Sequence, residues 1–386
     1  MNDELKKKFA DARCLFPHAG DVAYFNAASY GPFCTPVKEA IDANVKIRLE
    51  AKVDDSHEAF AVHDKLRQDY AGLIGADKRE VGVALSTTYG LNIAAFGLPL
   101  KEGDEVLVSD VEFPAAVYTF KGAAQARGFK VRFVESTDRF FDIEKFRKAI
   151  TPRTRALVLS FVQYFNGFKN DLDQIGAICK EHDIVFVVDG IQGMGAEVID
   201  VRKSQIDIFS SGCQKWMLAP QGCGFFYLSD DIRDRLVHSN MSWLSADWNV
   251  EFTNLFRFDL PYFDSARRFE MGYYAVLNLL GMNASVEIFK SLGIDNIQQH
   301  NHELIDRLVN HMRANSFYSI TSSMEGIHRS SIFTFKCPRL DELHAILGKR
   351  GIKVVKREGS IRVSVHLYNN EEDIDRLIAV LDEFAG

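Results

Sequence analysis

The 386-residue chain has few cysteines, and they lie far apart along the sequence. No C-x-x-C pair occurs, and no spacing is typical of a zinc site or a disulfide framework. Isolated thiols are typical of proteins kept in a reducing compartment. We therefore expect free thiols and a cytoplasmic location. The six cysteines are Cys14, Cys34, Cys179, Cys213, Cys223 and Cys337.

Motifs of several other enzyme classes are also missing. The sequence has no H-E-x-x-H pair, and we expect no metal site. No G-x-G-x-x-G turn follows the first strand-like segment, which argues against a nicotinamide-dependent dehydrogenase. Repeats and low-complexity tracts are absent as well, so disorder should be confined to the chain ends.

Long apolar runs and positive charge are equally scarce. The longest apolar run is too short to cross a membrane, and the first residues lack the apolar region of a secretory signal. The formal net charge is −7, which disfavours nucleic acid and anionic membranes as partners. Nine prolines against thirty phenylalanines indicate a densely packed interior, and the length suffices for two domains.

Two residues within the segment 184–228 have a chemical character. Asp189 ends a β-branched apolar run, where a buried strand delivers a carboxylate to the edge of a sheet. Lys215 follows a second apolar run and precedes bulky side chains, which favour its neutral, nucleophilic amine. Pyridoxal phosphate (PLP) suits both residues, because it forms a Schiff base with a lysine and needs a carboxylate at its ring nitrogen. The alternative is an aspartate that caps a helix and a lysine that only covers apolar surface.

Strand-like and helix-like segments alternate from Val81 to Leu228, which predicts an α/β fold with a mostly parallel sheet covered on both faces. Four polar or aromatic residues lie just beyond strand ends, where sheets of this kind bind ligands. Thr87 lies in a hydroxyl-rich turn that leads into a helix, and such a turn is typical of a phosphate site. These residues are Thr87, Phe113, Tyr164 and Asp189.

The segment VVDGIQ, followed by SGCQKW-x-x-x-PQG-x-GF, resembles the lysine-bearing signature of class V aminotransferase-fold enzymes. This group of PLP fold type I includes cysteine desulfurases, C–S lyases and isopenicillin-N epimerase-like proteins. The resemblance implies a large domain with a seven-stranded type of sheet and a smaller C-terminal α/β lobe. We expect the large domain over residues 20–260 and the small one over 261–386, with residues 1–19 packed on the small one.

The resemblance also assigns roles in the site. Lys215 would bind the cofactor covalently, and Asp189 would pair with its ring nitrogen. Phe113 stands where relatives place a ring over the cofactor, and as an aromatic hydrocarbon it cannot move protons. Whether Gln163, Tyr164 or Asn166 contacts the cofactor's phenolic oxygen stays open, with Tyr164 favoured. The remaining residues assigned to the cofactor are Thr87, Thr88, Gln192, Gln214 and Tyr273.

In the C-terminal region, the run beginning Ile361-Arg362 resembles the family segment whose arginine binds the substrate carboxylate. A guanidinium suits that role because it meets a carboxylate with two parallel hydrogen bonds, whereas a structural salt bridge is the alternative. Asn26 is a second expected substrate contact. Side-chain specificity should depend on the loops near Asn26–Ser29 and Trp243.

The expected activity is that of a PLP-dependent transferase or lyase acting on an amino acid through a Cα carbanion, with transamination as the main hypothesis. Elimination of the C–S lyase type, hydrolytic cleavage and epimerisation stay open, as does a non-catalytic sensor. A persulfide-forming desulfurase is disfavoured, because no cysteine lies between Arg350 and Ile361. Tyr273 stands where relatives reach the phosphate of the other subunit, so we expect a homodimer.

Overall fold

The computed structural model describes residues 1–386 except 54–56, 238, 240, 249–252 and 273–274. Its centre is a mixed sheet in which one strand, β8, runs antiparallel to both neighbours and all other neighbours are parallel. The predicted mostly parallel sheet is therefore confirmed. The spatial order is β2 (Val81–Ala84), β8 (Gly224–Leu228), β7 (Ile208–Gly212), β6 (Val185–Asp189), β5 (Thr154–Ser160), β3 (Glu105–Ser109) and β4 (Lys130–Val134).

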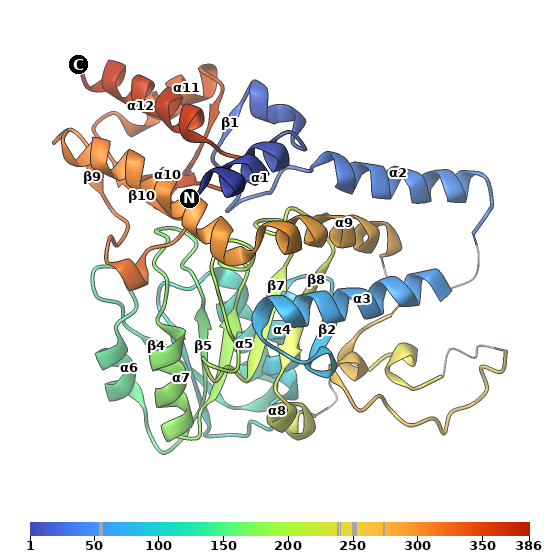
Figure 1. The fold of residues 1–386 in the computed structure, drawn as a ribbon. Helices are drawn as coiled ribbons and strands as arrows, with labels where there is room; N and C mark the ends of the chain where they lie inside the picture. Colours follow the sequence, from blue (N-terminus) through green and yellow to red (C-terminus); the bar gives the residue numbers. More distant parts are fainter. Residues whose placement is uncertain (54–56, 238, 240, 249–252, 273–274) are drawn as a thin grey trace.

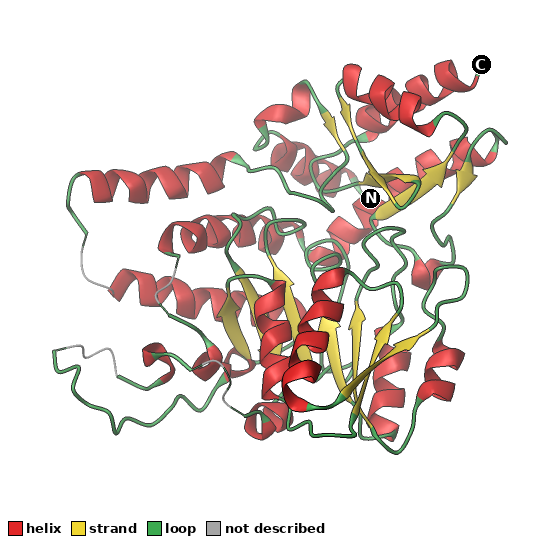
Figure 2. Cartoon of the chain, turned by 180° about the vertical axis from the view of Figure 1, so that it is seen from behind, coloured by secondary structure: helices red, strands yellow, loops and turns green. Residues whose placement is uncertain are grey.

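The central strands are apolar on both faces because helices cover both sides, as Figure 2 shows. In β6, Phe186 and Val188 face one hydrophobic cluster, while Val185 and Val187 face the other. The first cluster is completed by α3 (His57–Ile74), α7 (Leu172–Glu181) and α9 (Val276–Leu292), and the second by α4 (Thr87–Gly97) and α5 (Pro114–Arg127).

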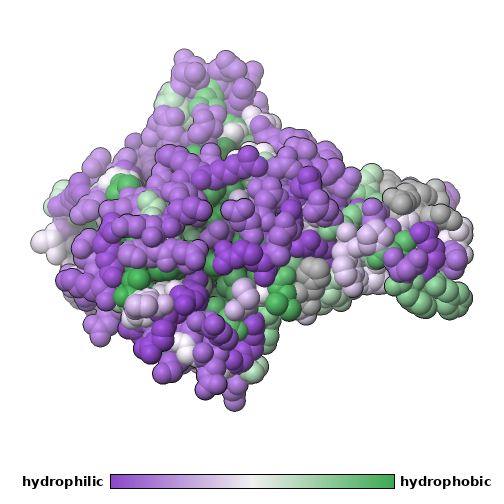
Figure 3. All heavy atoms as spheres, turned by 90° about the horizontal axis from the view of Figure 1, so that it is seen from below, coloured by the Kyte–Doolittle hydropathy of each residue, from purple (hydrophilic) through white to green (hydrophobic). Residues whose placement is uncertain are grey.

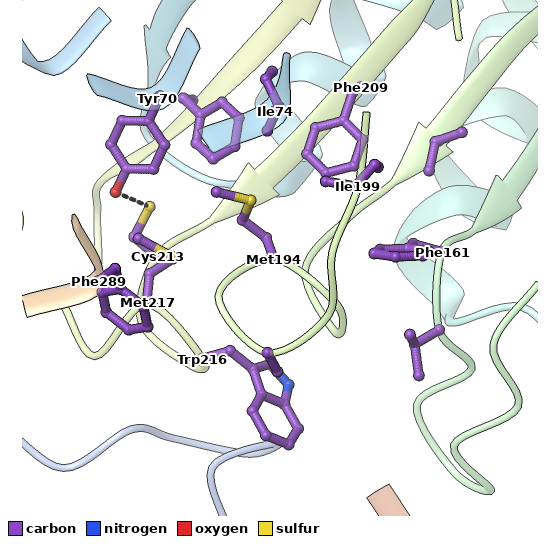
Figure 4. Close-up of a cluster of buried hydrophobic side chains, with 14 of the residues drawn as sticks. Tyr70, Ile74, Phe161, Met194, Ile199, Phe209, Cys213, Trp216, Met217 and Phe289 are labelled. Atoms are coloured by element: carbon purple, nitrogen blue, oxygen red, sulfur yellow. Dashed lines mark hydrogen bonds between the residues drawn. The ribbon is translucent and has the colours of Figure 1, made fainter. Parts of the chain in front are cut away.

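Part of the first cluster lies directly beside the segment that carries Lys215. Figure 4 shows Met194, Phe209 and Met217 there, together with Tyr70, whose hydroxyl lies 3.2 Å from the thiol of Cys213. Close packing of this kind restricts side-chain movement. The loop after β7 is thus held on a rigid base.

The C-terminal lobe contains an antiparallel sheet with its own hydrophobic cluster, and it lies above the large sheet in Figure 1. Helices pack on the apolar face of this sheet. The strand order is β12 (Val355–Arg357), β13 (Ser360–Ser364), β10 (Ile332–Lys336) and β9 (Ser319–Ile320). A parallel pair, β1 (Ala23–Tyr24) with β11 (Ile352–Lys353), joins the N-terminal region to this lobe. The helices of the lobe are α10 (Ile294–Arg313), α11 (Leu340–Lys349) and α12 (Glu371–Ala385).

The first residues contact the C-terminal lobe. Arg13, in α1 (Asp3–Arg13), forms an ion pair of 2.7 Å with Asp373, and the ring of Phe9 stacks on that of His300 at 4.1 Å. The division of the chain at residue 260 stays a prediction. The cluster under the small sheet takes its C-terminal members from Leu304 onwards, whereas α9 packs on the large sheet.

The remaining elements are short or lie at the periphery. None of the described helices is long and apolar enough to cross a membrane. The other α-helices are α2 (Thr35–Leu49), α6 (Ile143–Ala149) and α8 (Asp230–Arg235). The 3-10 helices are η1 (Pro17–Gly20), η2 (Lys78–Glu80), η3 (Trp243–Ser245), η4 (Ala266–Phe269) and η5 (Gly326–His328).

Candidate active site

Asp189 is the last residue of β6 and lies in register with Ser160 of β5 and Ser210 of β7. Its carboxylate is 2 % exposed and accepts a hydrogen bond of 3.0 Å from the backbone N–H of Ile191. Burial raises the pKa of Asp189 to about 6, while that hydrogen bond and the charge of Lys215 act in the opposite direction. Among the described residues it has no salt-bridge partner, so a bound cation would stabilise it.

Lys215 lies in the loop between β7 and β8, and its amine faces the same end of the sheet. Its Nζ is 5.6 Å from the centre of the Phe113 ring. Burial lowers the pKa of Lys215 to about 8, although the charge of Asp189 acts against this effect. The amine is therefore neutral in a large share of molecules near pH 8, as a nucleophile or a base requires.

The backbone of this loop is fixed by the N-terminal segment. The N–H of Gly31 donates to the carbonyl of Gln214 at 2.9 Å, and a Cβ at Gly31 would lie only 2.2 Å from the carbonyl oxygen of Lys215. Only glycine permits this close approach. The side chain of Gln214 is partly buried.

The N-terminus of α4 points to the same region and has the features of an anion site. Its cap residue Ser86 makes no side-chain capping bond, so first-turn N–H groups are available to a ligand. Thr87 is buried, and its hydroxyl accepts a hydrogen bond of 2.8 Å from the N–H of Gly212. Thr88 is exposed. The structure thus holds Thr87 against β7 and leaves Thr88 open to a bound phosphate.

The rings of Phe113 and Tyr164 lie together at the opening of the site, with centroids 5.2 Å apart and planes at 77°. The two alternatives to Tyr164 are engaged elsewhere. Gln163 is fully buried and donates to Glu112 at 2.7 Å, and Asn166 donates to the carbonyl of Arg139 at 3.0 Å. Tyr164 lies beside the Phe113 ring, and which of the three residues contacts the cofactor's phenolic oxygen stays a prediction.

Gln192 is 4 % exposed and belongs to a buried network. Its amide nitrogen donates to the carbonyl of Ala28 at 3.1 Å, and its oxygen accepts from the Trp216 indole at 2.9 Å. One N–H of the amide stays available for a further acceptor. Gln192 therefore connects the N-terminal loop to the loop that carries Lys215.

Arg362, on β13, is 1 % exposed and reaches the same region from the small lobe. It donates to the carbonyl of Tyr164 at 2.5 Å and to the hydroxyl of Ser29 at 2.7 Å. Burial and the charge of Arg357 lower the pKa of Arg362 to about 9. No carboxylate pairs with it among the described residues, which contradicts the alternative of a structural salt bridge.

Three buried polar atoms around Arg362 lack a partner, namely Arg362 Nε, Asn26 Oδ1 and Ser364 Oγ. Asn26 and Ser364 form a backbone bridge, so these atoms lie in one place. Unpaired buried polar atoms cost free energy unless a ligand satisfies them. Arg362 Nε and the Ser364 hydroxyl can donate to a substrate carboxylate, whereas Asn26 Oδ1 accepts and would need a donor. The substrate roles of Asn26 and Arg362 stay predictions.

A tight hairpin precedes Arg362. Strands β12 and β13 are joined by two residues, Glu358 and Gly359, which both have positive φ (47° and 77°), as in a type I′ turn. A two-residue turn has no room for a long loop with a nucleophilic side chain. The absence of a cysteine between Arg350 and Ile361 thus has a structural counterpart.

Sequence reasoning missed one buried carboxylate of the site. Glu112 is 7 % exposed, and its oxygens accept from the N–H of Ser160 at 2.9 Å, from the hydroxyl of Ser160 and from Gln163. Burial raises the pKa of Glu112 to about 7, and the charge of Asp189 contributes in the same direction. Its position before Phe113 was the available signal, but nothing in the sequence separates it from a surface glutamate.

Two residues named from the sequence stay predictions. Tyr273 lies outside the described residues. Trp243 begins η3 and is 42 % exposed, and its ring centroid lies 6.1 Å from that of Trp248.

Comparisons with known proteins show the family of the chain. The family model described as aminotransferase class-V matches residues 40–377. An uncharacterized aminotransferase, YcbU, of Bacillus subtilis (strain 168) is 25 % identical over 374 residues, covering 97 % of this chain and 96 % of that protein. A probable cysteine desulfurase of Pyrococcus abyssi (strain GE5 / Orsay) is 25 % identical over 397 residues, covering 97 % and 96 %.

Solved structures show the same fold. The apo structure of a cysteine desulfurase from Thermococcus onnurineus NA1 has a TM-score of 0.86 at 21 % identity, covering 97 % of this chain and 98 % of that one. The cystine C–S lyase C-DES, in complex with cysteine persulfide, has a TM-score of 0.85 at 22 % identity, with coverage of 95 % and 98 %. The prediction of PLP fold type I is thereby confirmed.

Proposed function

The chain belongs to the aminotransferase class-V family of PLP-dependent enzymes, and from this premise we propose that it transfers the α-amino group of an amino acid. One observation carries the proposal. Lys215, with its pKa near 8, and the unpaired buried Asp189 face the same end of the sheet as Arg362, which has no carboxylate partner among the described residues. An amine, a carboxylate and a guanidinium so placed fit a cofactor and a substrate carboxylate.

PLP, when bound, supplies a ring that withdraws electrons from the substrate Cα. Asp189 would hold the proton on the ring nitrogen, and the N-terminus of α4, with Thr87 and Thr88, would hold the phosphate. The Phe113 ring would cover the ring face and exclude water without moving a proton.

The protein's own residues would direct the proton transfer. Arg362 would hold the substrate carboxylate with two hydrogen bonds and so fix the direction of the Cα–H bond. Lys215 Nζ would take the proton from Cα and return it to a neighbouring atom, which a pKa near the working pH favours. A non-catalytic sensor would have no need for these three groups in one place.

The alternative reaction is β-elimination of the C–S lyase type, which begins with the same proton removal. The cystine C–S lyase among the similar structures supports this alternative at the level of the fold only. A desulfurase that forms a persulfide on a loop cysteine receives no support, because the hairpin at Glu358–Gly359 is short and carries no thiol.

A homodimer is part of the proposal. Residues 253–263 form an arm that projects from the body (Figure 1), and Figure 3 shows green, hydrophobic atoms among purple ones on this projection. Exposed apolar surface of this kind is typical of an interface. The large exposed apolar residues of the arm are Leu255, Phe256, Phe258 and Tyr262.

We also propose a cytoplasmic location, since all six cysteines are free.

The test is the visible spectrum of the purified enzyme with PLP, before and after addition of a panel of amino acids. Conversion to a stable pyridoxamine form supports transamination, whereas release of pyruvate and ammonia from a cysteine-like substrate supports elimination. A protein that stays colourless with PLP would contradict both reactions. Arg362→Ala should raise KM for amino acids far more than for amines without a carboxylate, and equal effects would place the carboxylate site elsewhere.

A further inference from the structure

A second arginine shares a sheet face with Arg362. Across β12 and β13, Val355 pairs with Arg362 and Arg357 pairs with Ser360. Side chains two positions apart on a strand point to the same face, so Arg357, Ser360 and Arg362 are on one face of the small sheet. The opposite face carries Ile361, which belongs to the hydrophobic cluster of the lobe.

The face with the two arginines is turned toward the large domain. Arg362 contacts the carbonyl of Tyr164, and the hydroxyl of Ser322 donates to the carbonyl of Asn166 at 2.6 Å. Arg357 is the diagonal neighbour of Arg362, and such positions lie roughly 7–8 Å apart. Both guanidinium groups are therefore carried to the same side, one buried and one at the rim.

Glu358, the residue after Arg357, holds the turn between β12 and β13 in place. Glu358 forms an ion pair of 3.1 Å with Arg139 and accepts a hydrogen bond of 3.4 Å from the hydroxyl of Tyr164. These contacts fasten the hairpin to the large domain. Arg357 itself is exposed and has no hydrogen-bond or ion-pair partner among the described residues.

The electrostatic effects agree with this placement. The pKa of Lys215 is lowered mainly by burial. The charges of Arg362 and, to a smaller extent, Arg357 lower it further. The charge of Arg357 acts likewise on Arg362, whose pKa is lowered first by burial and next by Arg357. Positive charge thus gathers on the substrate side, and two neighbouring like charges are stabilised when an anion binds between them.

We propose that Arg357 binds a second anionic group of the substrate, so that the enzyme prefers amino acids with an acidic side chain. This inference rests on the proposed function, because it takes Arg362 as the site of the α-carboxylate. A substrate with two acidic groups gives one to each guanidinium, and the planar fork of arginine matches a carboxylate, a sulfinate or a phosphate. A neutral amino acid would leave Arg357 in water.

The experiment measures kcat/KM of the PLP-loaded enzyme for L-aspartate, L-glutamate, L-cysteine sulfinate, O-phospho-L-serine and L-alanine. The variant is Arg357→Met, and the control is Lys356→Met, which removes a charge on the opposite face of the same strand, where Lys356 pairs with Asp341. Binding of maleate and of acetate to the same proteins is measured by calorimetry, as a readout that does not depend on turnover.

The expected result is a wild-type preference for one of the acidic substrates and a fall of about 10-fold to 100-fold in the ratio of acidic to alanine kcat/KM in Arg357→Met, the range for a lost charge-assisted contact. Lys356→Met should keep the wild-type ratio. The substrate with the largest fall identifies the anion.

A wild-type preference for alanine, or an unchanged ratio in Arg357→Met, would overturn the inference while leaving the proposed function intact. If no amino acid reacts, the proposed function fails, and the calorimetry then decides: maleate binding weakened in Arg357→Met alone supports the second anion site, whereas equal binding in both variants refutes it.

Discussion

The sharpest prediction on stability concerns the buried carboxyl of Glu112. Its pKa is about 7 in the folded chain, against an ordinary value of 4.5, because it is buried. A carboxyl whose pKa is raised by folding stabilises the fold when protonated, and this contribution is lost as the pH rises through about 7. For these two pKa values, the contribution falls by about 2–3 kcal/mol between pH 5 and pH 8.

Glu112→Gln removes the titration and keeps the hydrogen bonds. The amide oxygen can accept from the N–H of Ser160 and from Gln163, as Oε1 does in Glu112, and the amide nitrogen can donate to the Ser160 hydroxyl. The free energy of unfolding of the variant, relative to wild type, should therefore rise by about 2–3 kcal/mol from pH 5 to pH 8.

The assay is urea unfolding of the cofactor-free protein at both pH values, so that binding of PLP adds nothing to the measured stability. Glu135→Gln, which removes an exposed carboxylate, controls for general charge effects. If the free energy of unfolding differs between Glu112→Gln and wild type by the same amount at pH 5 and at pH 8, Glu112 is not held in the uncharged form. That result would refute the reasoning.

Two further predictions concern the framework of the site. Arg67 is 3 % exposed and binds buried Glu270 with two hydrogen bonds of 2.7 Å and 2.6 Å, so Arg67→Met should lower the free energy of unfolding by about 3–5 kcal/mol. Breaking the exposed Arg350–Glu383 pair by Arg350→Met should cost about 1 kcal/mol or less, and similar losses in both variants would contradict the burial argument. Gly31→Ala should weaken PLP retention after dialysis, because its Cβ would displace the Lys215 carbonyl, whereas Gly20→Ala meets no atom within 4 Å. Equal PLP content in wild type, Gly31→Ala and Gly20→Ala would show that this close approach does not position Lys215.

Local patterns were sufficient for most of the fold. The apolar run before Asp189 formed the buried strand β6, and the alternation from Val81 to Leu228 formed the mostly parallel sheet. The antiparallel direction of β8 did not follow from its sequence, because an apolar strand fits a sheet in either direction. The short strands β9, β11 and β12 were missed, since two or three residues show no periodicity.

The same distinction holds for the site. Lys215, Asp189 and Arg362 lie in segments whose residues show both the chemistry and the resemblance, and the structure carries them to one side of the molecule. Glu112 and Arg357 were not predicted, because their importance depends on partners distant in sequence. Burial against Ser160 makes Glu112 unusual, and the pairing of Arg357 with Ser360 makes Arg357 a diagonal neighbour of Arg362.

The central claim is that Lys215 is the residue that binds PLP. The most direct test is borohydride reduction of the PLP-loaded enzyme, followed by mass-spectrometric mapping of the modified peptide, with Lys215→Ala treated in parallel. The account predicts one stable modification on Lys215 in the wild type and none in the variant. Modification of another lysine in the wild type, or an equal yield of modified peptide in Lys215→Ala, would contradict it.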